Sequence, residues 1–67
     1  MEISARNQLP GTITRITLAE VMAEVTLDVG GREIVAAVTR GSVERMGLKE
    51  GDQVTAIIKA TEVMIGR

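Results

Sequence analysis

The feature of this sequence that most constrains its fold is a pair of β-strands joined by two glycines. Residues 21–29 carry an apolar side chain at every odd position, and Glu, Thr and Asp stand among the even ones. This period of two predicts a strand with one face toward a core. Gly30 and Gly31 follow directly and suit the positive φ angles of a tight hairpin turn. Residues 32–39 are therefore predicted to return as the antiparallel partner strand.

The returning strand is apolar on both of its faces. Ile34, Ala36 and Val38 share one face, while Val35 and Ala37 share the other. A strand of this kind is usually covered on both sides, yet a chain of 67 residues builds only one small core. Cys and His are absent, so disulfides and the usual zinc ligands cannot supply the missing stability. We therefore expect a second copy of the chain to cover the other face.

The rest of the chain predicts further strands and one short helix. Residues 7–18, rich in Thr and Ile, read as a long strand with a bend or bulge at Gly11. Residues 43–46 lie between glycines and predict a short helix. Residues 53–60 and 61–65 predict two more strands. Three strands, a helix and two strands form the layout of an all-β, five-stranded OB-type barrel with one short helix between strands 3 and 4, here expected to be oligomeric.

Composition excludes several classes of function for residues 1–67, which we expect to form a single domain. Eight basic and nine acidic residues are spread along the chain, and aromatic residues are absent. Nucleic-acid binding relies on a basic surface and stacked rings, so no nucleic-acid partner is predicted. No His or Cys is present to build a nucleophile–base pair, so we expect no enzyme.

No apolar run is long enough to span a membrane, and the first residues lack signal-peptide features. We therefore expect a cytoplasmic protein without membrane association.

Hydrogen-bond donors gather in the run Ser4-Ala5-Arg6-Asn7-Gln8. A tetrahedral dianion accepts hydrogen bonds on every side and so favours such donors. Arg6 offers a planar fork, Lys59 a point charge, and Ser4 and Ser42 hydroxyl groups. Ser42 also stands where the short helix is expected to begin, beside free backbone N–H groups. These residues predict a site for a small oxyanion.

Each of these residues also has an ordinary structural interpretation. Ser42 is typical of a helix N-cap, and Lys59 of a charge that protects the edge of a sheet. Ser4 and Arg6 lie near a terminus, where chains commonly fray. From the residues alone, both interpretations stay open.

The N-terminal run, with Gly11 and a strand after it, resembles the opening of the molbindin (Mop) family. Those are small molybdate-binding OB-fold proteins, and their domain also occurs in a molybdate-responsive transcription regulator and in ATPase subunits of molybdate importers. The resemblance covers essentially the whole chain. It continues through residues 21–25, 42–44, 47–51 and 59–65.

The resemblance implies a protein that binds molybdate or tungstate between subunits, for storage, buffering or delivery in molybdenum homeostasis. It implies a homohexamer built as a trimer of dimers, with no organic cofactor and no metal cation. The implied ligands are Ser4, Ala5, Arg6 and Asn7 of one subunit with Thr39, Ser42, Lys59 and Ala60 of a neighbour.

Two other hypotheses stay open at this stage. The run Gly47–Asp52 is also similar to a turn in DNA-binding regulators of the swapped-hairpin type. Such a regulator needs a basic segment ahead of that turn, whereas residues 40–45 are nearly charge-balanced. The fold could instead serve only as an oligomerisation module, in which case no oxyanion would raise its melting temperature.

Overall fold

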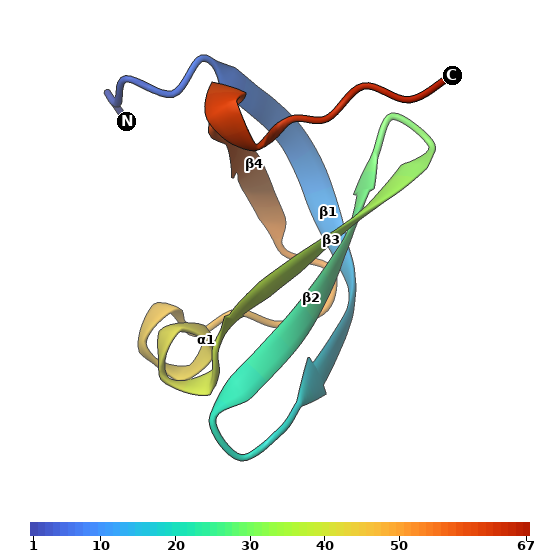
Figure 1. Ribbon diagram of the computed structural model, residues 1–67. Coiled ribbons are helices and arrows are strands. Elements are labelled where there is room, and N and C mark those ends of the chain that lie inside the picture. Colours follow the sequence, from blue (N-terminus) through green and yellow to red (C-terminus); the bar gives the residue numbers. More distant parts are fainter.

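A computed structural model describes all residues 1–67 as one four-stranded antiparallel sheet with a short helix (Figure 1). The elements are β1 (Asn7–Leu18), β2 (Met22–Val29), β3 (Arg32–Thr39), α1 (Arg40–Met46), β4 (Gln53–Ile58) and the 3₁₀ turn η1 (Ala60–Glu62). The strands lie in the order β3-β2-β1-β4. A mostly β architecture with its helix between the third and fourth strands is therefore confirmed. The only α-helix has seven residues, and no helix is long and apolar enough to span a membrane.

The predicted hairpin is confirmed almost residue for residue. β2 and β3 pair without interruption from Met22 opposite Thr39 to Val29 opposite Arg32. The turn between them has φ angles of 58° at Gly30 and 85° at Gly31, a conformation that residues with a side chain rarely adopt.

β1 is the strand that joins the two halves of the sheet. Its first half pairs with β4, from Asn7 opposite Ile58 to Thr12 opposite Gln53, and its second half pairs with β2. The register shifts between Ile13 and Arg15, so the expected irregularity lies beyond Gly11. Gly11 is required for another reason. A Cβ atom at this position would lie 2.9 Å from both the Asp28 carbonyl oxygen and Val29 Cγ2. The glycine allows β1 to approach the end of β2 closely.

We expect Gly11→Ala to lower the stability of the fold by about 1–3 kcal/mol, the usual cost of forcing extra atoms into a packed site. Because one of the two close neighbours is a backbone carbonyl, the strain cannot be relieved by turning a side chain. Chemical denaturation followed by circular dichroism measures the change. Gly41→Ala is the matched control, since nothing lies within 4 Å of a Cβ at that position. An equal loss of stability in both variants would contradict this assignment.

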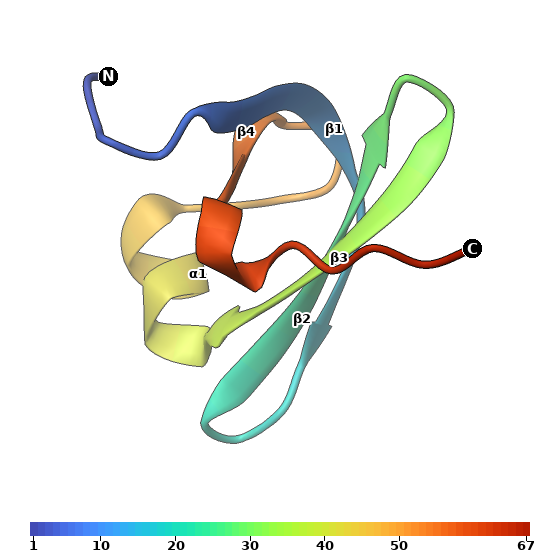
Figure 2. The same cartoon turned by 45° about the horizontal axis from the view of Figure 1, so that its top comes forward.

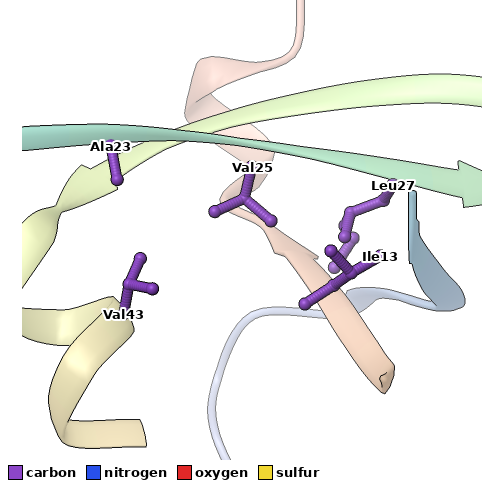
Figure 3. Close-up of a cluster of buried hydrophobic side chains, with 6 residues drawn as sticks. Ile13, Ala23, Val25, Leu27 and Val43 are labelled. Atoms are coloured by element: carbon purple, nitrogen blue, oxygen red, sulfur yellow. The ribbon is translucent and has the colours of Figure 1, made fainter. Parts of the chain in front are cut away.

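The core is small and entirely aliphatic. Its buried residues are Ile13, Ala23, Val25, Leu27, Val43 and Ala56. Figure 3 shows Val43 of α1 pointing toward Ala23 of β2, so the helix covers one end of the sheet. Because only six aliphatic side chains are buried, the core removes little apolar surface from water, which agrees with the expectation of a thin core.

The predicted fifth strand is absent, and the barrel is open in the single chain. β4 ends at Ile58, and the chain turns at once through η1, where the N–H of Glu62 donates to the Lys59 carbonyl at 2.9 Å. After this turn the chain leaves the end of β4 and runs across to the opposite side of the molecule, as the red segment shows (Figures 1 and 2). Residues 63–65 therefore pair with no strand, and β3 and β4 remain the two edges of the sheet.

An apolar groove lies between those two edges. It has a volume of about 580 Å³, and 14 of its 17 lining residues are hydrophobic. The residues after η1 are also apolar and stand in solvent, with Met64 91% and Ile65 93% exposed. On the outer face of β3, Val35 is 52% exposed. A single chain thus leaves much apolar surface uncovered.

Candidate anion-binding site

The residues just before β1 and just after β4 come together at one end of the β1–β4 pair. Because these strands are antiparallel, with Asn7 opposite Ile58, the N-terminal donor run comes to lie beside the residues that follow β4. Together they line a hollow of about 700 Å³. Its lining residues are Ser4, Ala5, Arg6, Asn7, Ile57, Lys59, Ala60 and Thr61. We call this hollow the donor pocket.

The donor pocket unites six of the eight residues predicted for the oxyanion site. One difference concerns Lys59 and Ala60, which were expected from a neighbouring subunit but lie beside the donor run of their own chain. The strand register is the reason, since it places the start of β1 and the end of β4 side by side.

The pocket's charge is positive. Arg6 and Lys59 line it, and no Asp or Glu does. Arg6 is exposed, and the only ion pair in the chain joins Arg40 to Glu44, so the Arg6 guanidinium is free to bind a ligand. The hydroxyl groups of Ser4 and Thr61 add two neutral donors.

The turn η1 begins with two residues that line the pocket, Ala60 and Thr61, and it leaves their backbone N–H groups without a partner. The first N–H that the turn uses belongs to Glu62, which bonds the Lys59 carbonyl, and the next belongs to Val63, which bonds the Ala60 carbonyl at 3.4 Å. The N–H groups of Ala60 and Thr61 precede these and are left unused by the turn, as at the start of any helical segment. Backbone donors beside two cations suit a small anion.

The two amide side chains of the donor run bond within the chain. Asn7 Nδ2 donates to the Ile58 carbonyl at 3.0 Å, and Gln8 Nε2 donates to the Ala5 carbonyl at 2.7 Å. Asn7 lines the pocket, but this nitrogen already holds β1 to β4. The donors left for a ligand are the hydroxyls, the two cations and the backbone N–H groups.

Thr39 and Ser42 lie apart from the donor pocket. The Thr39 hydroxyl accepts the Ser42 N–H at 3.0 Å and donates to the Ser42 hydroxyl at 2.7 Å. Thr39 is thus the N-cap of α1, the role that the sequence predicted for Ser42, and the helix begins at Arg40 rather than Val43. The helix leads into the start of β4, whereas the pocket forms at its end.

Comparison with known proteins agrees with this architecture. The family model for the TOBE domain matches residues 3–65. Molybdenum-pterin-binding protein 1 of Clostridium pasteurianum is 47% identical over 66 residues, which span 97% of each chain. The chain belongs to the TOBE-domain family, among the Mop proteins.

Solved structures agree with the fold of this Mop domain. A molybdate-binding protein from Sporomusa ovata matches with a TM-score of 0.95 and 45% identity over the whole of both chains. The cytoplasmic molybdate-binding protein ModG matches with a TM-score of 0.85 and 48% identity over 90% of this chain and 43% of its own. The open sheet with one short helix is therefore an OB-like fold of the kind found in molybdate-binding proteins.

Two pocket residues of this Mop domain escaped the sequence analysis. Thr61 follows Lys59 and Ala60 directly, but residue 61 was expected to begin a strand, so its hydroxyl was not counted as a donor. Ile57 was expected to be a strand residue, and only the register of β4 on β1 places it at the pocket. Adjacency to Lys59 was the signal that could have indicated Thr61.

Proposed function

We propose that this Mop domain binds molybdate or tungstate in the donor pocket. The observation that carries the proposal is a hollow lined by Arg6, Lys59 and two hydroxyl-bearing residues, with no carboxylate among its lining residues. Ala60 and Thr61, whose backbone N–H groups make no hydrogen bond within the chain, also line it. Each hydrogen bond to a charged partner contributes roughly 1.5–3 kcal/mol. The donors of the pocket could form about four to six such bonds. Together these would offset the free-energy cost of desolvating a small dianion. The similar protein from Sporomusa ovata and ModG are molybdate-binding proteins, which supports molybdate as the ligand.

We propose that a second copy completes the site. The pocket is open, and its donors come from one chain, whereas a tetrahedral anion accepts hydrogen bonds on all sides. Thr39 and Ser42 lie on other elements and would reach the anion only from a neighbouring subunit. Ser4, Ala5, Arg6 and Asn7 would then act with Lys59, Ala60 and Thr61 of the same chain.

The proposed assembly is a homohexamer, a trimer of dimers. The uncovered apolar surface of the single chain, in the groove between β3 and β4 and at the exposed residues 63–65, supports self-association. The number of subunits is what the resemblance to the family implies. In such an assembly, residues 63–65 would pair with a strand edge of a neighbour and supply the fifth strand that the single chain lacks.

The proposed role is storage, buffering or delivery of the oxyanion in the cytoplasm, without catalysis. The Mop family is one of molybdate-binding proteins rather than enzymes, and the similar ModG is described as cytoplasmic. A DNA-binding role is not favoured, because the similar proteins bind molybdenum compounds and the chain has no excess of basic residues. Because aromatic side chains are absent, no ring is available to stack on an organic pterin, and this favours the bare oxyanion as the ligand.

Isothermal titration of the assembled protein with molybdate, tungstate and sulfate tests the proposal. We expect molybdate and tungstate to bind and sulfate to bind much more weakly. Molybdate at about 100 times its dissociation constant should add about 2.7 kcal/mol to the free energy of unfolding. No heat and no stabilisation with molybdate would refute the proposed function and favour a purely structural oligomerisation module.

A further inference from the structure

We infer that Gln8 is a positioning residue, which holds Ser4–Arg6 in the shape that receives the anion. Gln8 belongs to the donor run but does not line the donor pocket, and it is not among the ligands that the family resemblance implies. The inference rests on the proposed function, since it concerns the same pocket.

The donor run has almost no other support. Residues 1–6 precede β1 and take part in none of the backbone–backbone hydrogen bonds outside the regular elements. The one hydrogen bond that joins any of them to the rest of the chain runs from Gln8 Nε2 to the Ala5 carbonyl, at 2.7 Å. Without it, no hydrogen bond would restrain the chain ahead of β1, and segments near a terminus commonly fray.

The position of this bond makes it effective. Ala5 stands between the two side chains that the anion needs, so fixing its carbonyl restricts the backbone on both sides, toward Ser4 and toward Arg6. A binding residue that is ordered beforehand loses less conformational entropy when the ligand arrives. The Gln8 amide can therefore raise affinity without touching the anion.

The backbone of Gln8 is held in the sheet, while its side chain is exposed. Its backbone lies opposite Ile57 in the β1–β4 register, one residue after Asn7, whose amide bonds the Ile58 carbonyl at 3.0 Å. Through its hydrogen bond to the Ala5 carbonyl, the Gln8 side chain thus ties the segment before β1 to the sheet. Since the Ala5 carbonyl can only accept, the residue at position 8 must be a donor of about this length.

The decisive variant is Gln8→Met, which keeps the length of the side chain and removes the donor. We expect affinity to fall roughly two- to tenfold, the range for one neutral hydrogen bond, and by the same factor for molybdate and tungstate. The salt dependence of binding should stay unchanged, because no charge is altered. In the ligand-free protein, ¹⁵N relaxation should show greater motion of the Ala5 and Arg6 amides.

Gln53→Met is the matched control. Gln53 Nε2 donates to the Thr12 hydroxyl at 2.9 Å across the same pair of strands, at the end far from the pocket. It loses an equivalent hydrogen bond, yet affinity and the motion of Ala5 and Arg6 should match the wild type. Light scattering on each variant verifies that the assembly is unchanged.

The outcomes separate this inference from the proposed function. If the wild type binds molybdate and Gln8→Met binds it equally well, the inference is wrong while the proposed function stands. Unchanged relaxation of Ala5 and Arg6 in Gln8→Met also overturns it, whatever the affinity. Equal losses of affinity in Gln8→Met and Gln53→Met would reduce Gln8 to a general structural role and overturn it as well. A wild type that fails to bind refutes the proposed function, and the inference that depends on it falls with it.

Discussion

Arg6→Ala should lower the affinity for molybdate by at least about tenfold while the oligomer persists. The guanidinium is exposed and has no ion pair or hydrogen bond within the chain, so its removal leaves no buried partner unsatisfied and should not harm the fold. Hydrogen bonds to a charged ligand are each worth about 1.5–3 kcal/mol, and about 1.4 kcal/mol corresponds to a factor of ten. Titration calorimetry on the assembled variant measures the loss.

Two further variants sharpen the Arg6 experiment. Arg32→Ala removes an equally exposed arginine at the tip of the β2–β3 hairpin, and its affinity should match that of the wild type. Arg6→Lys keeps the charge but not the planar fork, and should give an intermediate affinity. If Arg6→Ala binds molybdate as the wild type does, Arg6 is no ligand and the pocket has been misassigned.

Removal of residues 63–67 should break the assembly into smaller species and weaken molybdate binding strongly. The truncation deletes Met64 and Ile65, which are almost fully exposed in the single chain and which we propose to lie on a neighbouring subunit. If the second wall of the pocket comes from that subunit, the anion loses part of its donors as the assembly dissociates. Light scattering measures the mass, and calorimetry measures the affinity.

A shorter truncation controls for the loss of chain length. Removal of Gly66 and Arg67 alone keeps the apolar residues and should leave both mass and affinity unchanged. A protein without residues 63–67 that keeps the wild-type mass would show that these residues do not join the subunits. Wild-type affinity in a dissociated form would show that one chain holds the whole site.

The strands that local patterns determine were predicted well. The alternation before Gly30 depends only on neighbouring residues, and the hairpin formed where it was expected. From the sequence, the start of the helix was predicted three residues too late. The N-cap is Thr39, which the alternating pattern had assigned to the preceding strand. The local pattern of residues 61–65 could not decide whether they form a fifth strand. A strand forms only where the edge of another strand is available to pair with it.

The site was predicted by chemistry rather than by position. The donor run and Lys59 stood out as residue types, but about fifty positions separate them, and only the register of β1 on β4 brings them together. From the sequence, Asn7 was assigned to the oxyanion site, whereas Gln8 was placed in the donor run without being assigned to the site. The structure instead uses both to fix the chain, a distinction that depends on where each carbonyl group lies.

The pairing of β1 with β4 also has a consequence for how the protein forms during synthesis. Asn7 and Ile58 are 51 residues apart, so their pairing closes a long loop, whereas the β2–β3 hairpin closes over two glycines. Short loops close sooner than long ones. On the ribosome, the hairpin can therefore form while the chain is still growing, but the donor pocket cannot exist until residues 57–61 have emerged. A nascent chain can thus form the β2–β3 hairpin before it is able to bind an anion.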